Sequence, residues 1–291
     1  MDDSNDIKSL FPKTHVSRRG FVAATTVGAG FALAVQPIQA QTVITTDTAG
    51  LTSGDAKIPT PTGDIYGYYA HPTAGGPFAT VVVIQEIFGV HEHIKDVVRR
   101  FAKAGYFAVA PDLHGRQGDT TKAPDIQAIL AIVNRVPDAQ VYADIDAAVA
   151  WAKATGKGDT NRLGVTGFCW GGRMSWMYTA HNPNVKAASP FYGPLIRPAT
   201  ELQPKNPIDV AAQIKIPVLA FYGAADQGIP NDTVEKMRAE LKAKGVASSE
   251  IILYPDTPHG FHADYRPSYR ADKAKEAWEK MIAYFKSRGV A

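Results

Sequence analysis

The chain alternates between short, continuously apolar runs and longer stretches whose apolar residues recur at helical spacing. The runs that predict strands lie at 80–86, 106–112, 162–168, 185–193, 217–226 and 249–256. The stretches that predict helices lie at 92–105, 122–155, 170–182, 231–245 and 272–289. Continuous apolar runs are typical of strands buried on both faces, and their alternation with helices predicts an α/β fold with a mostly parallel, doubly wound sheet.

Two strands with alternating apolar residues precede this pattern. They lie within 56–72, on either side of the turn Pro-Thr-Gly-Asp, and they predict an antiparallel N-terminal edge of the sheet. No linker divides the chain beyond that point, so we expect a single domain over 41–291. Because ligands of such sheets bind at the carboxyl ends of the strands, the chemistry is expected at that edge.

Residues 1–40 do not fit the strand and helix pattern. Arg18 and Arg19 precede a moderately apolar stretch that runs from about Phe21 to Val35, and the segment ends on a small residue, Ala40. This order resembles a twin-arginine export signal. The resemblance implies a periplasmic or secreted protein with no stable membrane span after cleavage. A core helix or an uncleaved anchor is the alternative reading of the same residues.

Composition and charge narrow the range of partners. The net charge is +3, 20% of the residues are charged, and no run of five basic residues occurs, so neither nucleic acid nor an anionic membrane surface is expected as a partner. A single cysteine excludes an internal disulfide and a cysteine-based zinc site. His91 and His93 are two residues apart and would point away from each other on a helix, so we expect no metal and no other cofactor.

The single cysteine lies where a buried strand is expected to turn into a helix. Cys169 stands in the pattern Gly-x-Cys-x-Gly-Gly, and glycines around it allow a sharp turn with strained backbone angles. The start of the following helix favours a thiolate and offers backbone N–H groups to an oxyanion. A buried structural cysteine is the alternative reading of a lone thiol.

The rest of the chain favours a nucleophile at this position. Asp226, at the end of a predicted strand, and His259, just after another, follow it in the order that such a turn requires. A histidine can deprotonate the thiol, and an aspartate fixes the histidine tautomer. Glu86 ends another buried strand, where a carboxylate is costly without a partner. The backbone N–H groups of Ile87 and Trp170 are the expected oxyanion hole.

Five short segments resemble the dienelactone hydrolase family, which has the α/β-hydrolase fold. They are QEIFGV, PDLHGRQ, GFCWGG, GAAD and PHGF, and the likeness spans residues 55 to 288. The resemblance implies a Cys169–His259–Asp226 triad and an acyl-enzyme. It also implies that Glu86 contacts the resting thiol until substrate displaces it. Such a contact would keep the thiol neutral in an oxidising compartment.

The same resemblance implies where substrate binds. Arg116 matches a family arginine that holds a substrate carboxylate. A guanidinium can bind a planar carboxylate through two hydrogen bonds. The position of the family's second arginine holds Ala263 here, and Arg266 is the nearby candidate for its role. Phe88 and Tyr192 are candidate apolar walls of the pocket, with core packing as the alternative.

The sequence therefore predicts a monomeric hydrolase that cleaves a small lactone or carboxylic ester without a cofactor. A broad-specificity carboxylesterase or thioesterase on the same scaffold is the closest alternative. A non-catalytic periplasmic binding protein that keeps the pocket is the alternative from another class.

Overall fold

The computed structural model describes residues 44–246 and 248–291. The predicted signal peptide over 1–40 lies outside the described residues. Within the described residues, no helix has both the length and the apolar character needed to cross a membrane.

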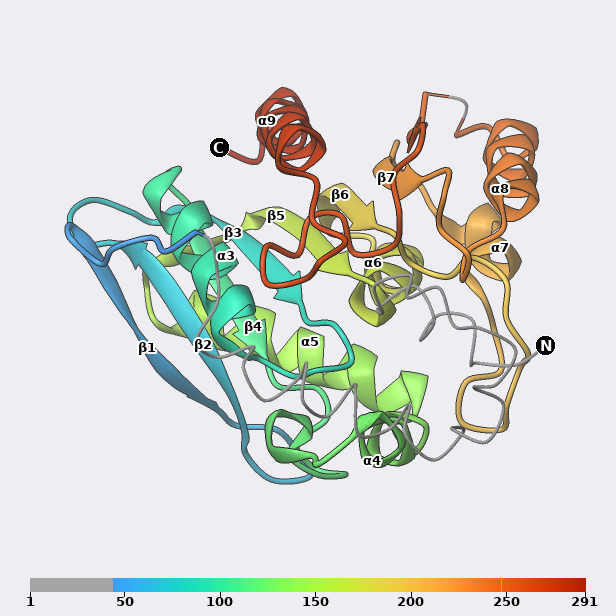
Figure 1. Ribbon diagram of the computed structural model, residues 1–291. Coiled ribbons are helices and arrows are strands. Elements are labelled where there is room, and N and C mark those ends of the chain that lie inside the picture. Colours follow the sequence, from blue (N-terminus) through green and yellow to red (C-terminus); the bar gives the residue numbers. More distant parts are fainter. Residues whose placement is uncertain (1–43, 247) are drawn as a thin grey trace.

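The described chain forms one sheet with helices on both of its faces (Figure 1). Its strands are β1 Leu51–Ile58, β2 Ile65–Pro72, β3 Phe78–Ile84, β4 Phe107–Pro111, β5 Gly158–Phe168, β6 Val185–Phe191, β7 Leu219–Gly223 and β8 Glu250–Tyr254. Its helices are α3 Glu92–Lys103, α4 Ile126–Val133, α5 Asp138–Ala154, α6 Trp170–His181, α7 Pro207–Val210, α8 Asn231–Ala243 and α9 Ala271–Ser287, with 3₁₀ turns η3 Thr120–Lys122 and η4 Ala211–Gln213.

The strand order is β1-β2-β4-β3-β5-β6-β7-β8. The pairs β1–β2 and β2–β4 are antiparallel, and every other pair is parallel. This confirms the predicted parallel sheet and its antiparallel N-terminal edge. Because each parallel strand is reached through a crossover, the carboxyl ends of β3 to β8 all lie along one edge of the sheet.

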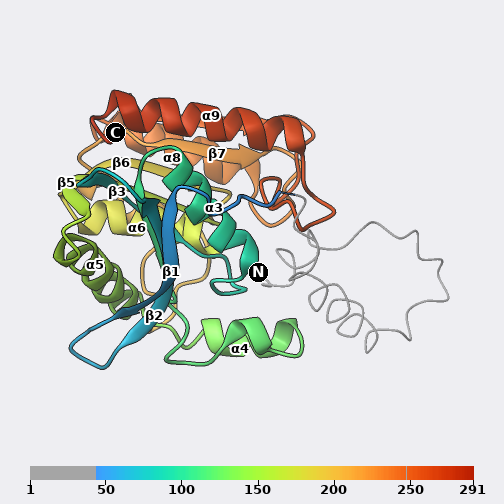
Figure 2. The same cartoon turned by 90° about the vertical axis from the view of Figure 1, so that its left-hand side faces the viewer.

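The central strands are buried on both faces, as their continuous apolar runs predict. Val81, Val82 and Val83 of β3 are all fully buried. Helices α3 and α9 cover one face, where the Phe101 and Trp278 rings are 4.7 Å apart. Helices α5 and α6 cover the opposite face (Figures 1 and 2). Burial of these side chains stabilises the fold by about 25 cal/mol for each Å² of apolar surface removed from water.

Strand ends differ from the sequence prediction by a few residues. β3 ends at Ile84 and β7 ends at Gly223, so Glu86 and Asp226 lie in the loops that follow these strands and not at their last positions. The difference keeps both carboxylates at the expected edge of the sheet.

The start of α6 packs very closely against β3. A Cβ atom on Gly171 would lie 2.3 Å from the carbonyl oxygen of Ile84 and 2.4 Å from that of Gln85. Both neighbours are backbone atoms of a central strand or of the loop that follows it, so they cannot move aside cheaply. Only glycine at position 171 therefore lets α6 pack this closely against β3.

We expect Gly171→Ala to reduce the free energy of unfolding by about 3 kcal/mol or more, because the added methyl group forces the helix away from β3. Chemical denaturation measures the change. Gly54→Ala on the edge strand β1 is the matched control, since its Cβ would meet nothing closer than 3.8 Å. Equal stability of the two variants would contradict the proposed packing constraint.

Candidate active site

Cys169 occupies the turn between β5 and α6. Its backbone has φ 54° and ψ −120°, angles that a residue with a side chain rarely adopts. Its N–H donates to the carbonyl oxygen of Phe191 at 3.1 Å, which ties the turn to β6. The side chain is mostly buried, with 8% of the residue exposed. A strained turn of this kind presents the thiol at the carboxyl edge of the sheet.

Two neighbouring turns surround the thiol. Trp170 is the first residue of α6, and the first N–H groups of a helix have no carbonyl partner within it. Ile87 lies in the turn after β3, and β3 pairs with β5 up to the match of Ile84 with Gly167. The backbone groups expected to form the oxyanion hole therefore belong to adjacent turns at one edge.

Asp226 and His259 are joined directly. The Oδ2 atom of Asp226 is 2.7 Å from Nδ1 of His259, and both side chains are buried. The other carboxylate oxygen of Asp226 accepts hydrogen bonds from the N–H groups of Gly228 and Ile229, at 2.9 and 3.2 Å. These bonds fix the carboxylate, which in turn orients the imidazole.

The two loops that carry this pair are held together by backbone contacts. The N–H of Ala225 donates to the carbonyl oxygen of Thr257 at 3.0 Å. A Cβ atom on Gly223 would lie only 2.1 Å from the same oxygen. The absence of a side chain at Gly223 thus lets the loop that carries His259 approach the end of β7.

The charge of His259 depends on its neighbours. Burial lowers the pKa of His259, but the negative charges of Asp226 and Cys169 outweigh burial and hold that pKa well above its ordinary value. The Nε2 atom of His259 is buried, and Cys169 is the neighbour besides Asp226 that raises the pKa of His259. The imidazole of His259 therefore favours its protonated form in the folded chain.

Glu86 is fully buried and is surrounded by partners from one loop. Its Oε1 atom is 3.1 Å from a terminal nitrogen of Arg266, and its Oε2 atom accepts a hydrogen bond from the hydroxyl of Tyr265. The Nε2 atom of His91 is 3.8 Å from the same Oε2 atom. Burial raises the pKa of Glu86, but Arg266 and His91 outweigh burial and hold it well below its ordinary value.

These contacts differ from the resting contact that the sequence resemblance implies. The ion pairs and the hydrogen bond of Glu86 found among the described residues go to Arg266, His91 and Tyr265, and none goes to Cys169. The carboxylate is held by a guanidinium, and both His259 and Arg266 interact electrostatically with Cys169.

The two candidate substrate arginines lie in different surroundings. Arg116 is 2.5 Å from Asp144 of α5, and it also donates to the Thr60 hydroxyl at 2.6 Å. Neither partner is one of the candidate catalytic residues. Arg266 does reach the site, through its ion pair with Glu86.

Both candidate wall residues touch charged members of the site. The guanidinium carbon of Arg266 lies 4.9 Å from the centre of the Phe88 ring. The Tyr192 ring lies 5.0 Å from that of His259, and Tyr192 has φ 35° just after β6. Phe88 therefore covers the guanidinium, and Tyr192 packs against the imidazole.

His91 and His93 face different carboxylates. His91 lies near Glu86, whereas Nδ1 of His93 is 2.7 Å from Asp264. Over residues 44–246 and 248–291, no three His, Cys, Asp or Glu side chains are grouped in a way that could hold a metal ion.

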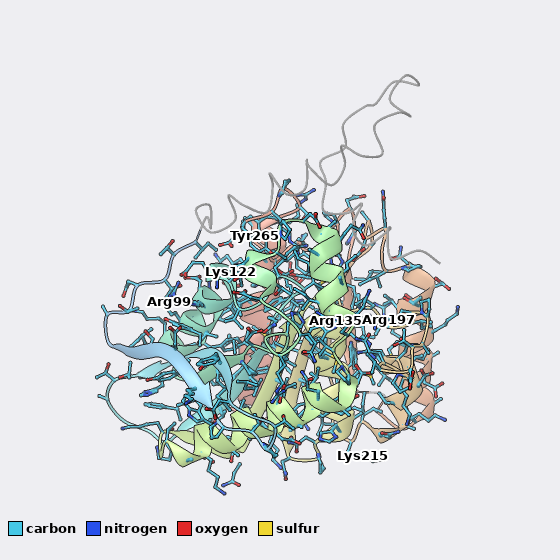
Figure 3. All side chains as sticks on the ribbon, turned by 90° about the horizontal axis from the view of Figure 1, so that it is seen from below. Arg99, Lys122, Arg135, Arg197, Lys215 and Tyr265 are labelled. Atoms are coloured by element: carbon cyan, nitrogen blue, oxygen red, sulfur yellow. The ribbon has the colours of Figure 1, made fainter. Side chains whose placement is uncertain are left out.

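Sequence reasoning missed two residues of the site. Tyr265, labelled in Figure 3, donates to Glu86 and accepts from Nε of Arg266 at 3.1 Å. His114 is fully buried, and its ring centre is 4.5 Å from that of Trp170. The sequence signal for Tyr265 is only its place next to Arg266, whereas His114 lies within the segment PDLHGRQ, two residues before Arg116.

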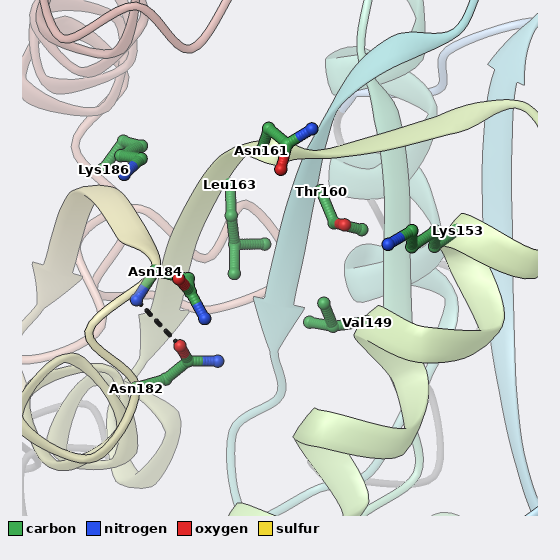
Figure 4. Close-up of a pocket in the computed structure, with 8 residues that line it drawn as sticks. All are labelled: Val149, Lys153, Thr160, Asn161, Leu163, Asn182, Asn184 and Lys186. Carbon is green, nitrogen blue, oxygen red and sulfur yellow. Dashed lines mark hydrogen bonds between the residues drawn. The ribbon is translucent and has the colours of Figure 1, made fainter.

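A separate pocket lies at the other end of the central strands. It has a volume of about 260 Å³ and is lined by Val149, Lys153, Thr160, Asn161, Leu163, Asn182, Asn184 and Lys186 (Figure 4). Leu163 lies in the first half of β5, whereas Cys169 follows its last residue. The exposed lysines of this pocket are therefore remote from the thiol.

The sheet order, the strained turn after β5 and the histidine–aspartate pair define an α/β-hydrolase. The family model of the dienelactone hydrolase family matches residues 65–289. The chain belongs to the dienelactone hydrolase family, and it is a hydrolase of the lactone or ester type.

Named relatives cover almost the whole chain. A protein of Methylorubrum extorquens named carboxymethylenebutenolidase is 56% identical over 98% of both chains. One of the same name from Escherichia coli O157:H7 is 47% identical over 91% of this chain and 98% of its own. The crystal structure of a dienelactone hydrolase from Klebsiella pneumoniae has a TM-score of 0.79 and 48% identity, over 81% of this chain and 98% of that one.

We expect removal of the Glu86 charge to make the free energy of unfolding less dependent on pH in the acidic range. The pKa of Glu86 is lower in the folded chain than its ordinary 4.5, so the unfolded chain takes up the proton first as the pH falls. The stabilisation is complete above pH 4.5 and declines below it. Glu86→Gln should cost about 3 kcal/mol at pH 7, because Arg266 is left buried without its partner, and should cost less at pH 3.5.

Urea denaturation at the two pH values measures both effects. Asp232→Asn is the control, because the ion pair of Asp232 with Lys236 is exposed and should matter little at either pH. If Glu86→Gln lowers the free energy of unfolding as much at pH 3.5 as at pH 7, the assigned ionisation of Glu86 is contradicted.

Proposed function

We propose that the protein hydrolyses a lactone or carboxylic ester through a thiolate of Cys169 and a covalent acyl-enzyme. The proposal rests on one arrangement. A thiol on a strained strand-to-helix turn stands at the same sheet edge as a buried histidine, whose other nitrogen is hydrogen-bonded to an aspartate at 2.7 Å. Cysteine nucleophiles with histidine and an orienting acid commonly catalyse acyl transfer.

In the first half of the reaction, the Cys169 sulfur attacks the carbonyl carbon of the substrate. A carbon–sulfur bond forms, and the oxyanion accepts hydrogen bonds from the N–H groups of Ile87 and Trp170. The ring carbon–oxygen bond then breaks, and the oxygen leaves as an enolate or alkoxide. Protonated His259 supplies the proton that this leaving group takes up.

In the second half, water attacks the thioester carbon. His259, now neutral, accepts a proton from that water, and Asp226 stabilises the resulting imidazolium. The carbon–sulfur bond breaks, the product leaves as a carboxylic acid or its anion, and the thiolate returns beside protonated His259. No oxidant, reductant or metal enters this balance.

The acyl-enzyme is the intermediate to detect. Mixing wild type with a butenolide or an aryl ester, followed by acid quench and mass spectrometry, should reveal a species heavier by the acyl group. Cys169→Ala should lack this species and lose at least about 10³-fold in kcat/KM, because no other group replaces the nucleophile. Full activity of Cys169→Ala would exclude the mechanism.

Two further comparisons separate the alternatives. A preference for simple aryl esters over every butenolide would favour a broad esterase or thioesterase on this scaffold. Cys169→Ser keeps a nucleophile of similar shape and should retain more activity than Cys169→Ala. A non-catalytic binding protein would turn over neither substrate in any of these variants.

Export by the twin-arginine route and a monomeric state remain proposals from the sequence. Arg18→Lys with Arg19→Lys should keep the protein in the cytoplasm if the twin-arginine pair is read as a signal. Cell fractionation of the native host measures the outcome.

A further inference from the structure

Both candidate substrate arginines are paired with a carboxylate, and Arg266 also has terminal nitrogens without a hydrogen bond to a described residue. Asp144 pairs with Arg116 at 2.5 Å, and Glu86 pairs with Arg266 at 3.1 Å. Both carboxylates are buried, so these pairs are only weakly screened by water. The terminal nitrogens of Arg266 nevertheless make no hydrogen bond to another described residue. A ligand at Arg266 would therefore find N–H donors beside a fixed negative charge.

A second group of unpaired polar atoms belongs to Trp170, the residue after the nucleophile, and to His114, whose ring contacts it. Both ring nitrogens of His114 and the indole nitrogen of Trp170 are buried and make no hydrogen bond to a described residue. Their rings are 4.5 Å apart at 67°. His114 follows β4 and Trp170 follows Cys169 after β5, so they meet over the end of β3, which lies between those strands.

His114 is uncharged at physiological pH. Burial lowers the pKa of His114 to about 3. A neutral imidazole offers one donor and one acceptor, and the indole offers one donor. These atoms suit a hydroxyl, a carbonyl or an amide, but they add no charge to hold a carboxylate.

We propose that this enzyme prefers a lactone or ester that is uncharged outside its reacting group, and that His114 and Trp170 bind a neutral hydrogen-bonding substituent of that substrate. The inference rests on the proposed function and names its substrate class. It departs from the name of the relatives, which denotes a butenolide with a carboxymethylene group. A carboxylate placed at Arg266 would face Glu86, and like charges side by side are repelled.

The decisive experiment compares two 5-alkylidene butenolides that differ only in the exocyclic substituent, which is a carboxylate in one and a primary carboxamide in the other. Wild type should turn over the amide with at least about tenfold higher kcat/KM. A Cys169-dependent preference for the carboxylate would overturn this inference and leave the proposed function intact. Failure to turn over either lactone, or turnover by Cys169→Ala, would overturn both.

His114→Leu tests the subsite, because leucine keeps an apolar volume and removes both nitrogens. Its kcat/KM for the amide should fall about tenfold, mainly through KM, while the unsubstituted 5-methylene butenolide is affected much less. An equal loss for both lactones would show that His114 is only structural, and would contradict its place in the subsite.

Arg116→Met with Asp144→Leu is the matched control for charge. The double variant replaces the whole ion pair, so no buried charge is left alone. The inference predicts that the ratio of kcat/KM for the two lactones stays within twofold of its wild-type value. A selective loss of turnover of the carboxylate lactone would show that Arg116 binds it, and would overturn the inference.

Discussion

The site depends first on the backbone of Cys169, which is held at φ 54° between β5 and α6. Such a conformation persists only where surrounding structure enforces it. Here β6 accepts the N–H of Cys169, and the start of α6 lies so close to β3 that only glycine fits at position 171. The fold therefore fixes the position of the thiol before any side chain of the site is considered.

The second constraint is charge compensation in a buried space. Four ionisable partners lie there as two pairs, Asp226 with His259 and Glu86 with Arg266. Each pair lowers the free-energy cost of burying its own charges. Each pair also fixes the orientation of its two side chains. Asp226 aims the imidazole toward the thiol side, whereas Arg266 and Tyr265 hold Glu86. The two pairs thus give the acid groups of one site different roles.

The sequence predicts the backbone of this site better than its side-chain partners. Continuous apolar runs identify the central strands, and the order of Cys169, Asp226 and His259 predicts which loops meet, since parallel strands end at one edge. The strand ends shift by a few residues at Glu86 and Asp226, because the apolar pattern does not mark the last ladder hydrogen bond. These shifts leave the carboxylates at the same edge.

The partners of long side chains follow from packing that no local pattern encodes. Arg116 stands in a segment that resembles a substrate-binding motif, yet Asp144 lies 28 residues away on α5 and takes its charge. Tyr265 carries no motif and His114 lies within the segment PDLHGRQ, but the partners of both become visible only where loops converge. Motif position therefore indicates which residues lie near the reaction, whereas the charge left for a substrate depends on pairings that only the three-dimensional structure reveals.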